Sequence, residues 1–182
     1  MKIDYKLNEN DFLIHLMYQI DYHKDYKKAK MEFYFSVPLI MILVGAILDY
    51  ISDEFFFVIL SLVLVIFWLP YAPKRYKNEK LKEMKVIAKD HVRKRDSENA
   101  ILIINQDYII SKEDFYESKH YKTEIADLTE IKNYYIINLK DKINKLLIPI
   151  KYIKNPEEFV NKFINMNIPY IDHSSWEFKN QA

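Results

Sequence analysis

The sequence predicts an α+β membrane protein, in which a two-helix transmembrane hairpin carries a cytoplasmic antiparallel β domain closed by a C-terminal helix. Three observations predict it: two long uncharged apolar stretches, clusters of lysine and arginine beside their outer ends, and a series of short strand-like runs in the C-terminal half. The mean hydropathy of −0.24 is typical of a soluble protein, because averaging over the chain hides this segregation.

Composition excludes several kinds of site. The chain has 182 residues with 27 Lys+Arg and 26 Asp+Glu, and its net charge of +1 provides no overall attraction to nucleic acid. Because it has no cysteine, it can form no disulfide, zinc–thiolate site or thiol nucleophile. Its single glycine, Gly45, excludes the glycine-rich loops that hold nucleotide phosphates.

Residues 1–32 predict a short strand followed by an amphipathic helix. Lys2–Leu7 alternates polar and apolar residues, as a half-buried strand does. Asn8 or Asn10 can cap a helix that begins near Asp11, and we expect this helix to continue through the lysine-rich segment 24–30 into the membrane. Its apolar face consists of Phe12, Leu13, Leu16, Met17 and Ile20.

Residues 33–72 predict the transmembrane hairpin. Phe33–Leu48 and Phe55–Ala72 contain no charged residue, and the second stretch has 18 residues. As a helix it is about 27 Å long, which nearly spans a hydrocarbon core of about 30 Å. The alternative is a buried hairpin in a soluble protein, but a core helix should show a polar face and neither stretch has one. We therefore expect spans at about 33–51 and 55–72.

The distribution of charge around the hairpin predicts its orientation. The connecting loop contains Asp49, Asp53 and Glu54 and no basic residue. Basic residues cluster outside both spans, at Lys24, Lys27, Lys28, Lys30, Lys74, Arg75, Lys77, Lys80 and Lys82. The positive-inside rule then places both termini in the cytoplasm and the loop outside. Pro70 and Pro73 are expected to mark the exit of the second span.

Residues 73–98 predict a basic cytoplasmic helix. Segment 74–95 contains ten basic residues against three acidic ones. Its narrow apolar stripe is made by Leu81, Met84, Ala88 and Val92. A basic helix beside the cytoplasmic leaflet is attracted to anionic lipid by about 1 kcal/mol per residue held near the surface. The alternative is an ordinary solvated cluster that only sets topology. The candidate contacts to anionic headgroups are Lys74, Arg75, Lys77, Lys80, Lys82 and Lys85.

Residues 99–167 predict a β domain with a C-terminal helix. Short runs rich in Ile and Tyr indicate an antiparallel meander or open barrel. These runs are Ala100–Asn105, Tyr108–Ser111, Phe115–Thr123, Ile125–Ile131, Tyr134–Leu139 and Lys145–Ile150. Asn155 followed by Pro156 and two glutamates is a typical helix start, and the helix that follows has an apolar face. Residues 168–182 are expected to form a tail, of which Asp172–Ala182 is either disordered or interfacial around Trp176 and Phe178.

Three segments, taken in order, resemble the YcxB-like family of small bacterial membrane proteins over roughly Met1–Asn167. They are KIDYKLNENDFLIHLMYQ at the start, YAPKRY at 71–76, and LIPIK followed by NPEEF near the end. The resemblance implies a pleckstrin-homology-like (PH-like) fold for the β domain, a location in the bacterial plasma membrane and a tethered binding module. One departure is Glu124–Leu128, where such domains often place a tryptophan before the strand-ending isoleucine.

No residue pattern points to catalysis. None of the histidines forms an HxxxH pair or lies beside acidic residues at metal-ligand spacing; they are His15, His23, His91, His120 and His173. We therefore predict no enzyme and no catalytic, metal or cofactor-binding residue.

Two functions remain open at this point. The first is an interaction or regulatory module that binds membrane lipids and an unknown protein partner at the inner face of the plasma membrane. The alternative is an immunity protein that protects its producer against a bacteriocin or secreted toxin. Its only support is the small size and the two-span topology. Nucleic acid is not expected as a partner.

Overall fold

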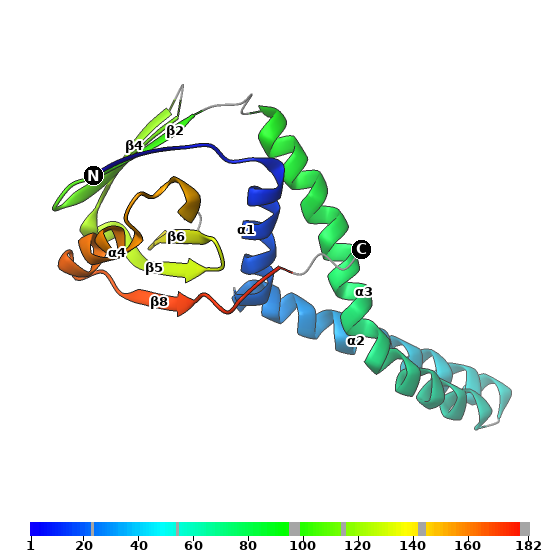
Figure 1. Ribbon diagram of the computed structural model, residues 1–182. Helices are drawn as coiled ribbons and strands as arrows, with labels where there is room; N and C mark the ends of the chain where they lie inside the picture. The colour runs from blue at the N-terminus through cyan, green and yellow to red at the C-terminus, as the bar shows by residue number, and fades with distance from the viewer. Residues whose placement is uncertain (23, 54, 95–98, 114–115, 142–144, 179–182) are drawn as a thin grey trace. The chain divides into compact units, whose positions relative to one another are not determined.

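The computed structural model describes residues 1–22, 24–53, 55–94, 99–113, 116–141 and 145–178. The chain forms two compact units. One combines Met1–His15 with Ala88–Ala182 and is called the β unit here, and the other, Leu16–Ile87, is called the helical unit. Two long apolar helices, mostly antiparallel sheets and a short C-terminal helix together give the predicted α+β layout (Figure 1).

The first half of the chain contains two helices, α1 (Glu9–Tyr22) and α2 (Lys24–Ser52). The sequence predicts that one helix continues from near Asp11 through segment 24–30, and this continuity depends on the residue between α1 and α2. His23, between the two helices, lies outside the described residues.

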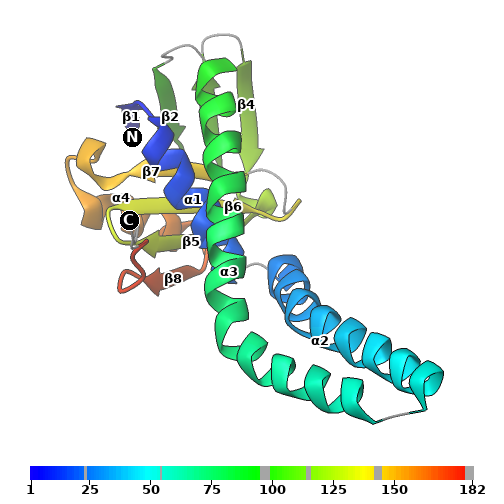
Figure 2. The same cartoon turned by 90° about the vertical axis from the view of Figure 1, so that its right-hand side faces the viewer.

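The second span and the basic helix are one element, α3 (Phe56–Lys94), of 39 residues. Pro70 and Pro73 lie inside this helix rather than at its end. A proline in a helix interior removes one backbone hydrogen bond and bends the axis without necessarily ending the helix. Figure 2 shows that α3 changes direction in its middle part. The predicted end of this helix at Arg95 lies outside the described residues.

By length and composition, two helices could cross a membrane. They are Tyr26–Ser52, with a mean hydropathy of 2.0, and Phe56–Asp90, with 2.3. Only 11% of the most apolar window of each is buried inside the protein. Core helices of soluble proteins bury their apolar surface, whereas most apolar side chains of these two helices face outward.

Within the helical unit, α2 and α3 approach closely around Gly45. A Cβ added there would clash with the Ser61 hydroxyl and would lie 2.8 Å from the carbonyl oxygen of Phe57. The Ser61 hydroxyl is within hydrogen-bond distance of the carbonyl oxygens of Met41, at 3.0 Å, and Phe57, at 2.8 Å, and donates its single proton to one or the other. Gly45, the single glycine of the chain, therefore lies where the backbone of α2 packs directly against the Ser61 side chain and the Phe57 carbonyl group of α3.

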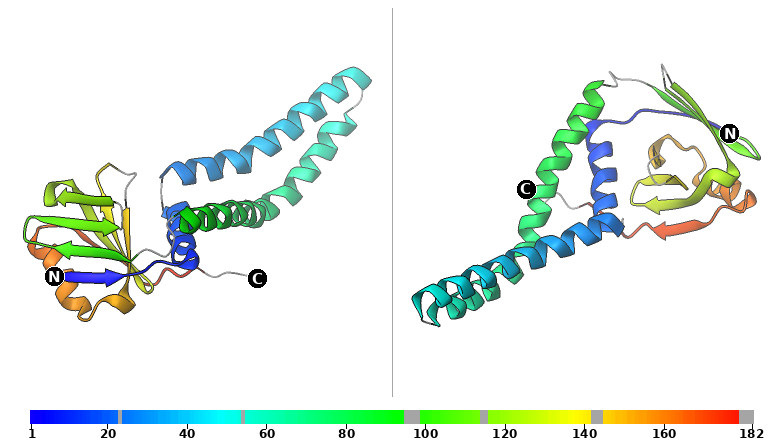
Figure 3. Two further views of the ribbon diagram at one scale, coloured as in Figure 1. Left: turned by 90° about the horizontal axis from the view of Figure 1, so that it is seen from above. Right: turned by 180° about the vertical axis from the view of Figure 1, so that it is seen from behind.

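The β unit contains two four-stranded sheets (Figure 3). The first has the order β1-β2-β3-β4, and its strands are Lys2–Tyr5, Ala100–Ile104, Tyr108–Glu113 and Tyr116–Tyr121. The second has the order β7-β6-β5-β8, with β5 at Ile125–Ile131, β6 at Tyr134–Leu139, β7 at Lys145–Pro149 and β8 at Tyr170–His173. Strands β2 to β7 confirm the six predicted runs, with boundaries that differ by a few residues. A 3₁₀ turn at Lys122–Glu124 links the two sheets, and a second at Ile150–Tyr152 follows β7.

Two strands come from outside the predicted β domain. β1 pairs antiparallel with β2, so that Ile3 lies opposite Leu102. β8 pairs parallel with β5, which places a strand in the segment predicted as a tail. Hydrophobic alternation identified β1 as a strand, whereas Tyr170–His173 has no such alternation and its backbone pairing with β5 forms the strand.

One hydrophobic core joins both sheets and α4 (Pro156–Asn165). Phe159 and Phe163 of α4 are fully buried in it, and the ring centroids of Phe159 and Tyr135 are 4.9 Å apart. The predicted helix start is confirmed, because the side-chain oxygen of Asn155 accepts the Glu158 N–H at 3.1 Å.

Candidate functional site

Four of the six predicted lipid contacts share one face of α3. At 3.6 residues per turn, Lys74, Arg75, Lys82 and Lys85 fall within about a third of the helix circumference. All four are exposed. We call these four residues the basic face. The same part of α3 is buried along the opposite side, at Ala72, Tyr76, Met84 and Ala88.

The other two predicted contacts do not belong to this face. Lys80 follows Tyr76 and precedes Met84 at four-residue steps, so it lies on the buried side, and its ammonium is 2.6 Å from the Glu83 carboxylate. Lys77 is exposed, although its direction on the helix lies between those of Met84 and Ala88. Within the basic face, the Arg75 guanidinium is 2.9 Å from the Glu79 carboxylate. Lys74, Lys82 and Lys85 carry no ion pair among the described residues.

The predicted apolar stripe of this helix is only partly correct. Met84 and Ala88 are buried, but Leu81 is only half-buried. The Val92 side chain lies outside the described part of the chain. The buried stripe continues instead through Tyr76 and Ala72, at steps of four residues.

Aromatic side chains cluster where the apolar part of the hairpin meets its charged end. The Phe33 ring centroid is 5.7 Å from that of Trp68 and 5.4 Å from that of Tyr76. The Tyr34 and Tyr76 rings meet edge to face at 6.3 Å, and the Arg75 guanidinium lies 5.8 Å from the Trp68 ring. Such amphipathic rings are enriched at the headgroup level of membranes.

A second set of aromatic residues lies at the turn of the hairpin. Tyr50 is 90% exposed and Phe55 is 84% exposed. Tyr34 and Tyr50 are 16 positions apart in α2. Phe55, which directly precedes α3, and Tyr71, in the middle of α3, are also 16 positions apart. Sixteen helical residues rise about 24 Å, which is close to the hydrocarbon thickness of about 30 Å. Both helices therefore place aromatic rings at the spacing of two membrane interfaces.

The β unit has a polar cleft of about 590 Å³ that sequence reasoning did not predict. We call it the α4 cleft. It is bounded by the β2–β3 turn, by Lys122 and by the last turn of α4, and its lining residues are Ile104, Asn105, Gln106, Asp107, Lys122, Lys162, Asn165 and Met166. Its volume lies within the range of about 300–1,000 Å³ that is usual for small-molecule sites.

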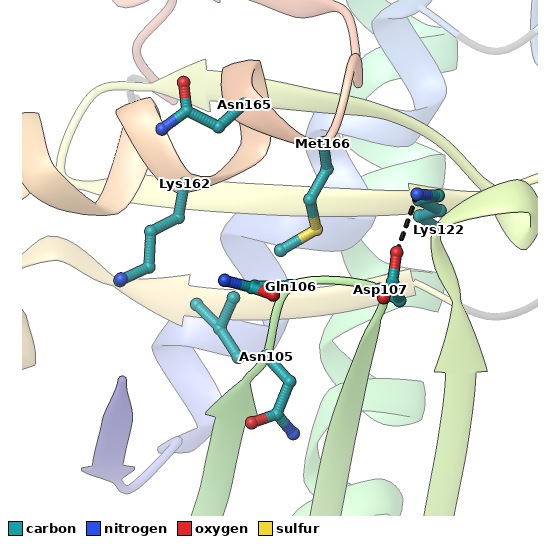
Figure 4. Close-up of a pocket in the computed structure, with 8 residues that line it drawn as sticks. Asn105, Gln106, Asp107, Lys122, Lys162, Asn165 and Met166 are labelled. Atoms are coloured by element: carbon teal, nitrogen blue, oxygen red, sulfur yellow. Dashed lines mark hydrogen bonds and ion pairs between the residues drawn. The ribbon is translucent and has the colours of Figure 1, made fainter.

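The α4 cleft carries one excess positive charge, since two lysines face a single aspartate. The Lys122 ammonium is 2.7 Å from the Asp107 carboxylate, so this pair is neutral overall (Figure 4). The Lys162 ammonium and the Gln106 carboxamide point toward the same space, and the Met166 side chain points into it (Figure 4). The nearest carboxylate to Lys162 is that of Glu158, on the preceding turn of α4 at 3.8 Å.

A separate group of buried polar residues connects α1 with the second sheet inside the β unit. The Tyr134 hydroxyl donates to the Asp11 carboxylate at 2.7 Å, and Asp11 also accepts the Asn8 N–H at 2.9 Å. Burial and this hydrogen bond raise the pKa of Tyr134. Burial, followed by the charge of Lys145, lowers the pKa of His15 to about 4. Asp11, His15 and Tyr134 are buried among protein atoms and do not line the α4 cleft.

Sequence reasoning missed the α4 cleft because its residues come from three separate segments. The polar Asn105-Gln106-Asp107 turn and the polar side of α4 are each ordinary surface patterns. Only the fold brings the turn and α4 to the same cleft. The Lys122 N–H donates to the Asp107 carbonyl oxygen at 2.9 Å, which joins the third segment, Lys122, to the turn.

Comparisons with known proteins add no relative to this description. No family model, no curated protein and no solved structure matches the chain.

Proposed function

We propose that the protein is an integral membrane protein whose two apolar helices span the bacterial plasma membrane, with both termini in the cytoplasm. The observation that carries this proposal is the outward exposure of both apolar helices, of which only 11% of the most apolar window is buried. The basic residues that flank the spans and the acidic loop between them support the orientation. The two aromatic sets at membrane-interface spacing support the same placement.

The absence of cysteine allows a direct test of this topology. Two single-cysteine variants are used. Ser52→Cys, at the end of α2, places a thiol beside the hairpin loop, and Ser175→Cys, after β8, places one near the C-terminus. On intact cells, a membrane-impermeant maleimide should label Ser52→Cys, whereas Ser175→Cys should react only after permeabilisation. The reverse labelling would overturn the orientation. Release of the protein from membranes by alkaline carbonate would overturn membrane insertion.

The β unit serves, in this proposal, as a non-catalytic PH-like interaction module beside the inner leaflet. Its mostly antiparallel sheets and C-terminal helix support the PH-like assignment, which comes from the resemblance to the YcxB-like family. The basic face of α3 would contact anionic headgroups, because Lys74, Lys82 and Lys85 are exposed on one side of the helix. A protein partner for this module is part of the same proposal.

Lipid contact by the basic face predicts a measurable preference for anionic lipid. Replacing Lys74, Lys82 and Lys85 together by Gln should reduce the number of phosphatidylglycerol molecules that stay bound when the protein is released from mixed micelles, as counted by native mass spectrometry. Each lysine near the surface contributes about 1 kcal/mol. The matched control replaces three exposed lysines outside α3, Lys2, Lys151 and Lys154, by Gln. Equal lipid retention by the two triple variants would contradict the proposal.

A further inference from the structure

The turn and the helix that form the α4 cleft are held in place by the fold. In the β2–β3 turn, the Asn105 N–H donates to the Tyr108 carbonyl oxygen at 3.0 Å. At the end of α4, the Met166 N–H is 3.2 Å from the Lys162 carbonyl oxygen and 3.1 Å from that of Phe163. The N–H groups of Asn105 and Met166 are therefore paired within the protein and are not donors for a ligand.

Among those side chains, Lys162 is the cation with the weakest protein partner. Lys122 is committed to Asp107 at 2.7 Å, whereas the Lys162–Glu158 pair is exposed and 3.8 Å long. Exposed pairs of this kind contribute little, so the Lys162 ammonium can turn to a ligand at small cost. Gln106 adds an amide donor, for which no hydrogen bond is described within the resolved ranges of the β unit.

We propose that the α4 cleft binds a small molecule through a phosphate group, with Lys162 and Gln106 as the donors. The excess positive charge of the lining favours an anion. The two donors come from different elements and approach from different directions, which suits the tetrahedral oxygens of phosphate better than the single plane of a carboxylate. Lysine binds phosphate as a point charge, with no demand for bidentate geometry. Met166 and Ile104 provide an apolar wall for the rest of the ligand.

The phosphate group could belong to a soluble ester or to a lipid headgroup, and the experiment separates these sources. The full-length protein in zwitterionic nanodiscs is titrated, at constant ionic strength, with inorganic phosphate and with glycerol 3-phosphate, and binding is followed by isothermal titration calorimetry. A third arm uses nanodiscs that contain phosphatidylglycerol, without soluble phosphate, and measures how much of this lipid the protein retains. Lys162→Met is compared with Lys154→Met, which removes the same charge from an exposed position outside the cleft.

We expect saturable binding that falls about tenfold or more in Lys162→Met, because charge-assisted hydrogen bonds contribute at least that factor, and that stays unchanged in Lys154→Met. Gln106→Ala should weaken binding as well, and because Gln106 is exposed in a turn, this variant keeps the test valid if Lys162→Met disturbs α4. Loss of binding in Lys162→Met confined to the soluble arms identifies a soluble ester, and loss confined to the phosphatidylglycerol arm identifies a headgroup.

Absence of saturable binding in all three arms, or an equal loss in Lys162→Met and Lys154→Met, would overturn the proposal. The α4 cleft lies within the β unit, so this result is independent of the cysteine-labelling test of membrane insertion.

Discussion

His15 is a residue whose burial should make the stability of the β unit depend on pH. Its pKa falls from 6.5 to about 4, first because of burial and then because of the charge of Lys145. The unfolded chain therefore takes up a proton near pH 6.5, and the folded one only near pH 4. The stabilising contribution of neutral His15 is fully present above pH 6.5 and is lost as the pH falls through about 4.

The measurement is the free energy of unfolding of the purified protein in detergent between pH 4 and pH 7. His15→Gln should remove a slope of at most about 1.4 kcal/mol per pH unit from the wild-type profile. The control is His120→Gln, in the edge strand β4, which should keep that slope. If His15→Gln and the wild type show parallel profiles, His15 does not titrate differently in the two states.

At the scale of elements, α3 is capped by a residue of the preceding helix. The Asp49 carboxylate of α2 accepts the N–H groups of Phe57, at 2.7 Å, and Val58, at 2.9 Å. No acidic residue lies in the first turn of α3 itself. Asp49 is therefore both the N-terminal cap of α3 and a link between the two helices of the hairpin.

Asp49→Asn should lower the thermal midpoint of the hairpin in detergent, because the neutral amide has one acceptor oxygen for two donors. The loss should be about 1 kcal/mol, the usual contribution of a cap. Asp53→Asn removes the same charge from the same turn, and asparagine tolerates the positive φ of 56° at this position. The Asp53→Asn midpoint should stay close to that of the wild type, and equal shifts in both variants would point to a general charge effect.

Elements were predicted well where local pattern controls them. Strands β2 to β7 and the capped start of α4 follow from alternation and from the Asn155-Pro156 signal. The continuation of α3 as one helix through Pro70 and Pro73 was not predicted, because helix continuity depends on neighbouring packing as well as on local propensity. The α4 cleft was missed for a different reason, because Gln106 and Lys162 are more than 50 positions apart.

At the scale of the whole molecule, the β unit depends on a strand from the opposite end of the chain. β1 pairs with β2, and its Ile3 and Tyr5 side chains are only 5% and 4% exposed within the core. Lys2 and Asp4, which alternate with them, are exposed. The two sets lie on opposite faces of the same short strand and so provide matched variants.

The double variant Ile3→Thr with Tyr5→Thr should lower the free energy of unfolding by roughly 3 kcal/mol or more, because two large side chains leave the core. Lys2→Thr with Asp4→Thr should have an effect within about 0.5 kcal/mol, as is usual for surface positions. Limited proteolysis of the β unit and thermal unfolding in detergent measure both. Similar destabilisation by the two pairs would show that β1 does not contribute to the core through these side chains.

The immunity role also belongs to the scale of the whole molecule, and it stays a prediction. If that role is correct, a sensitive strain that expresses the chain should survive exposure to a toxin whose gene lies beside the gene of this protein. Unchanged killing would leave the interaction module as the remaining hypothesis.

Apolar length, charge asymmetry and strand alternation are local properties, so residues 33–72 identified the candidate spans and residues 100–149 the strands without any coordinates. Tertiary structure alone decided which distant segments meet. It joined β1 to β2 and β8 to β5, and it brought Lys162 and Gln106 to the same cleft. The physical reason is that backbone pairing and core burial act between residues far apart in the chain, and the order of residue types along one sequence does not record which of them will be neighbours.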